Sequence, residues 1–457
     1  MQANQTSNMR RTLLMGLSAG AFLNACGGGA GDDIGLQPRI IDFGADRANA
    51  LVGETVRLTA VFANGSGRIE PMIGTVSSGI AVQSPPLAGP TRFRLIVRNG
   101  NAQVERELMM PVGYRNRYRV LAQSFNVARH AAVALGDGSV LAIGGSRGNF
   151  TLSNKLTRYD PATERFSDIG QLASGREYHS ATVLADGRVL VVGGTISLAG
   201  FGASELIDPR SGAVTATGAL QKHRQGHTAT RLNDGRVLVI GGWGPGGDAL
   251  GKHASAEIWD PTTGRFRLLP ALMQTTRAGH TATLLNDGRV LVAGGFSGMA
   301  AYRFAERFDP ATETFTAVAS VHNEVRAMHG AHRLSDGSVL LLGGENASGS
   351  AASSAVLRYV PAQQRVDSAA SLTAPRSIVA SVLGAGDRVL LFGGADINLL
   401  ATSTAESWQP DSGAAPLAAM PRTRIWHSTT MLADGRVLIL GGEDHQHHFV
   451  GDALLYE

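Results

Sequence analysis

The segment from residue 426 to residue 448 holds most of the side chains in this sequence that could bind a metal or a ligand. Imidazole nitrogens commonly bind zinc and copper, so the His-x-His-His run formed by His445, His447 and His448 could bind Zn or Cu. The alternative is a solvated, His-rich loop without a fixed ligand geometry, and we favour it. An indole, a further imidazole and two carboxylates accompany the run: Trp426, His427, Glu443 and Asp444.

Histidine also recurs along the chain, usually three residues after an arginine. The pairs are Arg176/His179, Arg224/His227, Arg277/His280, Arg326/His329 and Arg424/His427. His130 lacks such an arginine, and Arg376 lacks such a histidine. A ring of histidines could hold a metal, but a metal site needs each ligand once, whereas a structural bond between units is needed in every unit. We therefore predict that these side chains are buried and hydrogen-bonded.

Positions that vary between the units are more informative about a binding site. The residue before each of these histidines and the residue after each Gly-Gly pair change from unit to unit, and several are aromatic or acidic. Such side chains suit stacking and hydrogen bonding to a sugar or to a partner chain. The candidate ligand-binding residues are Tyr178, Trp243, Phe296, Glu345, Trp426, His427, Glu443 and Asp444.

Short strands in a repeat of about 50 residues must position these side chains. A Val-Leu-x-x-Gly-Gly segment, with small changes, ends at Gly145, Gly194, Gly242, Gly295, Gly344, Gly394 and Gly442. Before each doublet lies an Asp-Gly pair, or Gly386-Asp387 in the sixth unit, which supplies the positive φ of a tight primed hairpin turn. A third strand ending in an aromatic residue and a fourth strand follow, so each unit has four antiparallel strands. The variable loops after the Gly-Gly pairs mark the expected binding face.

The Gly-Gly doublets, the Asp-Pro turns and the aromatic partners resemble Kelch repeats. This resemblance implies an all-β fold with a seven-bladed Kelch-type β-propeller over residues 115–457. The chain ends in the third strand of the seventh unit, whereas a strand at residues 117–122 precedes the first unit. We predict that this early strand completes the last blade, because closure removes the exposed edges of an open array.

Residues 37–113 differ from the repeats. Short runs there alternate apolar and polar positions between Asn-Gly-rich turns, which predicts a β-sandwich. The segment resembles bacterial immunoglobulin-like domains, which commonly act as spacers. We therefore expect an immunoglobulin-like β-sandwich in front of the propeller.

The N-terminus has the features of an export signal. A basic stretch and a short apolar run end at Leu23-Asn24-Ala25-Cys26, which looks like a lipobox. We expect residues 1–26 to be a lipoprotein signal peptide, with lipid attached to Cys26, the only cysteine. A flexible tether would follow over residues 27–36. Gly27 after the cysteine indicates an outer membrane lipoprotein whose domains face the periplasm or the cell exterior.

The charge balance argues against nucleic acid as a partner. The formal net charge is +4, and removal of residues 1–26, which contain Arg10 and Arg11 and no acidic residue, leaves +2. The sequence contains no Lys/Arg cluster able to neutralise a row of phosphates.

Arg10-Arg11 also resembles a twin-arginine export signal.

The stretch from Trp426-His427 to Gly441-Gly442 also looks like part of the galactose and glyoxal oxidases, which are seven-bladed Kelch copper enzymes. In that family a Tyr-His pair at this place binds copper, so only His427 carries over. The family's cysteine-linked tyrosine has no counterpart, because Cys26 is the sole cysteine. A radical copper oxidase is therefore disfavoured.

The leading hypothesis is a non-catalytic binding protein, held to a membrane by its lipid anchor, that presents the propeller to a glycan or a protein. The alternative is a carbohydrate-active enzyme that resembles periplasmic Kelch sugar epimerases, which use Arg, Glu and His around the central funnel. Fold alone cannot decide between the two. Convergence of an acid, a base and an arginine within hydrogen-bonding reach would favour the enzyme.

Replacement of Cys26 by serine tests the anchor. We expect Cys26→Ser to release the mature protein from membranes, because a serine cannot take the lipid and the signal offers no other attachment. Fractionation of cells with and without detergent measures the effect. Membrane association of the variant that still requires detergent for release would contradict lipidation.

Overall fold

The computed structural model describes an all-β chain. The residues described are 37–148, 151–197, 200–201, 203–247, 251–297, 304–320, 326–345 and 351–457, so Cys26 and the expected signal and tether lie outside them. Within these ranges the helical elements are two 3-10 turns, η1 (Pro361–Gln363) and η2 (Ala385–Asp387). None of the described helical segments has the length or the apolar character needed to cross a bilayer.

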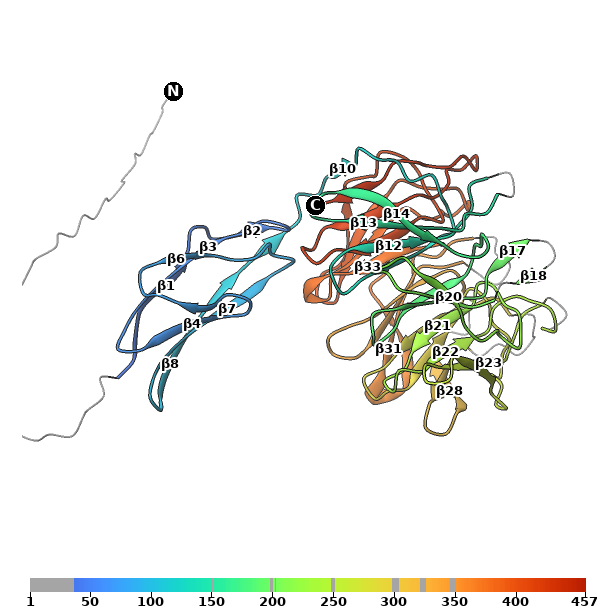
Figure 1. Ribbon diagram of the computed structural model, residues 1–457, viewed down its shortest axis with the longest axis horizontal. Coiled ribbons are helices and arrows are strands. Elements are labelled where there is room, and N and C mark those ends of the chain that lie inside the picture. Colours follow the sequence, from blue (N-terminus) through green and yellow to red (C-terminus); the bar gives the residue numbers. More distant parts are fainter. Residues whose placement is uncertain are drawn as a thin grey trace, which may run out of the picture.

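The N-terminal unit is a β-sandwich of two sheets around one core (Figure 1). Apolar residues of both sheets, including Leu58 and Phe93, are completely buried between them. The first sheet has the order β1 (Arg39–Ala45), β3 (Arg57–Ala63), β6 (Ala81–Gln83). The second has the order β5 (Gly74–Val76), β4 (Ser66–Glu70), β7 (Thr91–Asn99), β8 (Ala102–Met110). A short parallel pair, β2 (Ala50–Leu51) and β9 (Val112–Gly113), completes the unit.

The remaining strands form a β-propeller. They fall into seven antiparallel groups of four, numbered here as blades 1 to 7. Blade 1 contains β11 (Ala131–Ala134), β12 (Val140–Ile143), β13 (Lys155–Asp160) and β14 (Arg165–Gln171). Blade 2 contains β15 (Ser180–Val183), β16 (Val189–Val192), β19 (Glu205–Ile207) and β20 (Val214–Ala216). Blade 3 contains β21 (Thr228–Arg231), β22 (Val237–Ile240), β23 (Ala256–Asp260) and β24 (Arg265–Leu268). The loop of blade 2 adds a small hairpin, β17 (Thr195–Ser197) and β18 (Gly200–Phe201).

Blades 4 and 5 form one continuous sheet, because the outer strands β28 and β32 pair in parallel. Blade 4 contains β25 (Thr281–Leu284), β26 (Val290–Ala293), β27 (Ala305–Asp309) and β28 (Thr314–Ser320). Blade 5 contains β29 (Gly330–Arg333), β30 (Val339–Leu342), β31 (Val356–Val360) and β32 (Arg365–Ala369). Blade 6 contains β33 (Ala380–Leu383), β34 (Val389–Phe392), β35 (Ala405–Gln409) and β36 (Gly413–Leu417). Blade 7 is β37 (Ser428–Met431), β38 (Val437–Leu440), β39 (Leu454–Tyr456) and β10 (Tyr118–Val120).

Strands from the two ends of the propeller sequence close the ring. The early strand β10 lies at the outer edge of blade 7, where Tyr118 pairs with Tyr456 and Val120 with Leu454 (Figure 1). The inner strand β11 of blade 1 contacts the inner strand β37 of blade 7, as every other inner strand contacts its neighbours. The predicted completion of the last blade by the N-terminal strand is therefore confirmed.

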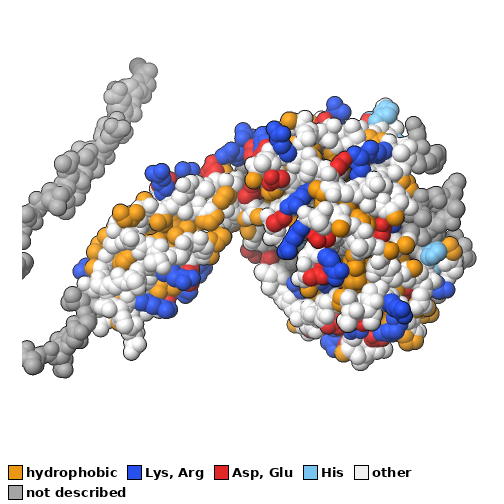
Figure 2. Space-filling model, in the orientation of Figure 1, with side chains coloured by type: hydrophobic (Ala, Val, Ile, Leu, Met, Phe, Trp, Pro, Cys, Tyr) orange, Lys and Arg blue, Asp and Glu red, His pale blue; other side chains and the backbone are white. Residues whose placement is uncertain are grey.

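The hydrophobic core of the propeller is divided among the spaces between blades. Each of seven buried clusters combines residues of two neighbouring blades, and the cluster between blades 7 and 1 contains Leu438, Leu455, Val140 and Tyr159. The second strand of every blade has four consecutive buried residues, because both faces of the sheet are covered by neighbouring blades. On the face shown in Figure 2, basic and acidic side chains are interspersed.

The hairpin turns differ from the primed turns that the Asp-Gly pairs predict. In six blades only the glycine has a positive φ, for example Gly138 at 86°, while the aspartate keeps a negative φ. The amide of Gly138 donates to the carbonyl of Leu135, so the turn is a type I turn followed by a left-handed glycine. The aspartate is favoured because its carboxylate accepts the amide two residues later, as Asp137 does from Ser139. Gly386 and Asp387 both have positive φ.

Deletion of the closing strand should destabilise the propeller more than removal of the sandwich. Without residues 115–123, blade 7 loses its outer strand and β39 becomes an exposed sheet edge. We expect a melting temperature lower by roughly 10 °C or more. A protein that starts after residue 113 keeps every strand of blade 7 and is the control. Equal melting temperatures for the two truncations, measured by circular dichroism, would contradict this role of β10.

Candidate functional site

Seven residues at the inner ends of the blades surround the propeller axis in a left-handed backbone conformation. Their φ angles lie between 51° and 64°, and they are Arg129, Tyr178, Gly226, Gly279, Met328, Ile378 and Trp426. Amides of five of them donate to the carbonyl of the corresponding residue in the preceding blade; the Arg129 amide, for example, donates to Trp426 at 3.0 Å. A non-glycine residue costs roughly 1–2 kcal/mol in this conformation, so contacts with the surrounding structure must offset that cost at the five positions without glycine.

The recurring histidines lie directly after this ring and bond neighbouring blades. Their Nε2 atoms lie 2.7–3.0 Å from the hydroxyl that follows the equivalent ring position in the preceding blade. The four pairs are His130 with Ser428, His227 with Ser180, His280 with Thr228, and His329 with Thr281. The structural role predicted for the recurring histidines is confirmed for these four, whereas the Nε2 atoms of His179 and His427 have no hydrogen-bonding partner among the described residues.

Burial holds these imidazoles neutral. Desolvation lowers the pKa of His130 to about 4 and the pKa of His227 to about 3, because a charged imidazole loses its hydration in the interior. The neighbouring Arg224 guanidinium lowers the pKa of His227 further. The ring therefore consists of neutral hydrogen-bonding groups rather than of cations.

The recurring arginines fix the loops around the axis. Each arginine is buried and donates to backbone carbonyls of its own blade, and four also pair with a buried glutamate of the third strand. These pairs are Arg176–Glu205, Arg224–Glu257, Arg277–Glu306 and Arg376–Glu406. Leucine replaces the glutamate in blades 5 and 7. Burial lowers the pKa of Arg424 to about 10, although the charge of Asp452 opposes the shift.

A cavity of about 310 Å³ opens at the axis beside this ring. Its wall contains the ring positions of six blades and the imidazoles of His130, His179, His280, His329 and His427. Tyr178 and Trp426 meet edge to face there, with ring centroids 5.5 Å apart and planes at 87°. Both side chains are partly exposed, so they present apolar surface to the cavity.

Arg129 organises the polar side of the cavity. Its guanidinium lies 5.8 Å from the centre of the Tyr178 ring and 5.7 Å from that of Trp426, and it forms two hydrogen bonds to the carboxylate of Glu443. Glu177 lies 4.0 Å from the same guanidinium. Burial raises the pKa of the Glu177 carboxyl, although Arg129 opposes the shift.

Neither Arg129 nor Glu177 was among the predicted site residues. Arg129 occupies the same variable position before the histidine as Tyr178 and Trp426, so the pattern that selected those two residues could also have selected Arg129. Glu177 precedes the variable position, where the sequence gave no reason to select it. Contact between blades 7, 1 and 2 brings these residues together, and this contact depends on ring closure.

The other predicted ligand residues lie at the same end of the blades but do not line the cavity. Trp243 and Phe296 pack on each other with ring centroids 6.0 Å apart. Glu345 is buried in the bridge that it forms with Ala327, and burial raises its carboxyl pKa. Of the predicted set, Tyr178, Trp426 and His427 line the cavity. Glu443 is not part of the cavity wall but accepts a hydrogen bond from Arg129, which is. Asp444 accepts the amides of Gln446 and His448.

The His-rich loop does not assemble a metal site in the part of the chain that the structure describes. His447 approaches Glu443 and His448 approaches Asp444, each at 3.4 Å, so the imidazoles form separate pairs. The described residues contain no group of three or more His, Cys, Asp or Glu side chains that could hold a metal ion. The donor set at His427, with Trp426 beside it, does not fit copper, and His445, His447 and His448 do not converge on Zn or Cu.

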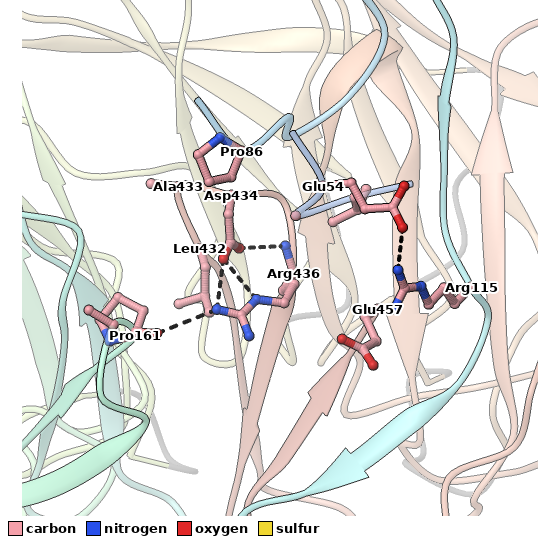
Figure 3. Close-up of a pocket in the computed structure, with 12 residues that line it drawn as sticks. Glu54, Pro86, Arg115, Pro161, Leu432, Ala433, Asp434, Arg436 and Glu457 are labelled. Carbon is pink, nitrogen blue, oxygen red and sulfur yellow. Dashed lines mark hydrogen bonds and ion pairs between the residues drawn. The ribbon is translucent and has the colours of Figure 1, made fainter. Parts of the chain in front are cut away.

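A larger cavity of about 460 Å³ lies at the junction of the sandwich and the propeller (Figure 3). Its cations are already paired, Arg115 with Glu54 and Arg436 with Asp434 (Figure 3). The junction lies on the side of the Asp-Gly turns, where the Tyr114 hydroxyl donates to the Gly435 carbonyl at 3.1 Å. We assign this cavity to contact between the two units, because its polar groups bond across the junction or within one unit.

Comparison with known proteins places the fold and leaves the activity open. No family model matches the chain, and no curated protein matches it. Among solved structures, it is similar to a fungal alcohol oxidase with catalytic diversity among the AA5 family, in complex with copper. The match has a TM-score of 0.63 at 17% identity and covers 74% of this chain and 76% of that chain. At this identity the likeness shows the shared all-β propeller fold alone.

The buried histidines should make the protein sensitive to mild acid. Their pKa values are lower in the folded state than the ordinary 6.5, so the unfolded chain binds more protons, and stability falls as the pH drops below 6.5. The variant His227→Val copies Val379, which occupies the same position in blade 6. We expect it to reduce the loss of unfolding free energy between pH 6.5 and pH 5 by about 1.5 kcal/mol. Urea titrations measure this loss, and an unchanged pH dependence would contradict the assignment.

Proposed function

We propose that this protein is a membrane-anchored, extracytoplasmic binding protein whose propeller takes a glycan in the axial cavity. The observation that carries the proposal is the pair of partly exposed rings, Tyr178 and Trp426, that meet beside Arg129 in the cavity wall. In this proposal the lipid on Cys26 attaches the chain to the outer membrane. The sandwich acts as an immunoglobulin-like spacer, and the propeller is of the Kelch type.

The size and chemistry of the cavity support a small ligand. A volume of about 310 Å³ lies at the lower end of small-molecule sites, which suits a single sugar ring better than a folded partner. Indole and phenol rings stack on the apolar face of a sugar, while arginine and carboxylate groups bond its hydroxyls. The loops after the Gly-Gly pairs surround the same end of the propeller.

A sugar-converting enzyme is the second candidate function, and Glu177 is the observation that favours it. Its carboxyl is largely buried with a raised pKa, and its Oε2 atom has no hydrogen-bonding partner among the described residues. A raised pKa of this kind is a property of general acids, but Glu177 lies behind Arg129 and Tyr178 and is not itself part of the cavity wall. The copper chemistry of the fungal oxidase is not proposed for this chain, because the described residues lack the donor set.

Screening of the purified protein against a glycan array, with and without Zn and Cu, separates the two functions. Retention of a sugar without conversion supports the binding protein, whereas appearance of an epimer or another product supports the enzyme. Retention that depends on added metal would contradict the metal-free site described above.

Replacement of Trp426 by alanine should weaken binding of the retained sugar about tenfold, since an aromatic contact in a desolvated site contributes roughly 1–2 kcal/mol. Trp243→Ala should have a smaller effect, because that ring packs on Phe296 and does not line the cavity. Arg188→Ala, in a turn on the opposite face, is the control. Titration calorimetry measures the affinities, and greater loss from Arg188→Ala than from Trp426→Ala would move the site to the other face.

A further inference from the structure

Trp243 and Phe296 form an aromatic pair at the loop end of blades 3 and 4. Their ring centroids lie 6.0 Å apart with the planes at 42°, and both side chains are partly exposed. Neither residue lines the axial cavity. Two adjacent aromatic rings that keep contact with solvent present an apolar surface on which a ring-shaped ligand can stack.

Glycines make room for this pair beside the axis. Of the seven left-handed positions around the axis, only Gly226 and Gly279 are glycine, and they belong to the same two blades as the aromatic pair. A Cβ atom at Gly226 would lie 2.7 Å from the Trp243 indole, and one at Gly279 would lie 3.6 Å from the Phe296 ring. The aromatic side chains therefore pack against the backbone that surrounds the axis.

The aromatic pair borders the wall of the axial cavity. Gly279 and Met328 both line the cavity, and Gly279 is the glycine against which Phe296 packs. Gly226, which contacts the indole of blade 3, donates its amide to the carbonyl of Tyr178 at 3.0 Å, and Tyr178 also lines the cavity. The surface of the pair is therefore continuous with the cavity at both glycines.

Gln225 supplies a polar group at this border. Its backbone amide and carbonyl bond to those of Trp243, each at 2.9 Å, and its side-chain oxygen accepts the hydroxyl of Thr195 in blade 2. The Gln225 side chain is partly exposed, and its amide nitrogen can donate to a ligand. An aromatic surface beside an amide donor suits a sugar, which has an apolar ring face and hydroxyl groups at its edge.

We infer that Trp243 and Phe296 form a second sugar subsite beside the axial cavity, so that the ligand is an oligosaccharide of at least two rings. The inference rests on the proposed function and specifies the class of its ligand. The cavity of about 310 Å³ has room for one sugar ring, so a further ring must lie on the surface next to it. The aromatic pair provides that surface one blade away from Tyr178.

The test compares one sugar ring with two in the full-length protein, kept in a detergent without a sugar headgroup. The probes are methyl glucoside with maltose and cellobiose, and methyl mannoside with α-1,2- and α-1,6-mannobiose, titrated by calorimetry. For a sugar that binds, a disaccharide should bind wild-type protein about tenfold more tightly than the methyl glycoside, because the second ring gains the aromatic contact. This comparison does not depend on the folding of a variant.

Variants locate the additional affinity. Trp243→Ala should bind the disaccharide about tenfold more weakly than wild type and the methyl glycoside within about twofold, whereas Trp243→Phe should retain most of the difference. Phe296→Ala should also reduce the difference, and it replaces Trp243→Ala if that variant does not fold. Phe166→Ala removes a partly exposed ring from the outer strand of blade 1 and is the control, with both affinities unchanged.

The outcomes distinguish the second subsite from the proposed function. Equal binding of one ring and two rings to wild-type protein, or a disaccharide preference that persists in Trp243→Ala and Phe296→Ala, would overturn the second subsite and leave the axial site intact. Failure of every glycoside to bind wild-type protein would overturn the proposed function and the second subsite together.

Discussion

Burial of apolar side chains between neighbouring blades is the constraint on which the rest of the propeller depends. A single four-stranded blade exposes two apolar faces, and each buried cluster contains residues of two adjacent blades. The clusters are complete only when the ring is closed, since the last one joins blade 7 to blade 1. The pairing of β10 with β39 closes that ring with strands from the two ends of the propeller sequence. Loss of any one interface between neighbouring blades would therefore open the ring.

Closure brings seven loops to one axis, where polar groups must be buried. The protein meets this requirement with a repeated set of bonds: arginine to backbone carbonyls and glutamate, and histidine to a hydroxyl of the preceding blade. Desolvation keeps the histidines neutral, so the imidazoles add hydrogen bonds without adding charge. Most of the arginines and histidines that recur in the sequence therefore stabilise the propeller.

The candidate site arises where the repeated set is broken. Arg129, Tyr178 and Trp426 occupy a position that is glycine in blades 3 and 4, and Ala380 replaces a hydroxyl that other blades provide. These departures lie in neighbouring blades 6, 7, 1 and 2 around one cavity. A rigid scaffold with local departures from its repeat can hold a ligand without reorganisation, which favours binding because less entropy is lost.

The sequence by itself determined the repeat, the four strands of each blade, the closure by the N-terminal strand and the structural role of the recurring histidines. These features depend on local periodicity and on recurrence, which are visible in one dimension. The predicted turn type was wrong, because an aspartate whose carboxylate accepts the amide two residues later favours a type I turn followed by a left-handed glycine. Only the tertiary structure decided which variable residues share a cavity. Trp243 and Trp426 carry similar signals in the sequence, yet only Trp426 lines the cavity, and Arg129 meets Glu443 although 314 residues separate them. Such contacts depend on the angular order of the blades and on ring closure, which spacing along the chain does not encode.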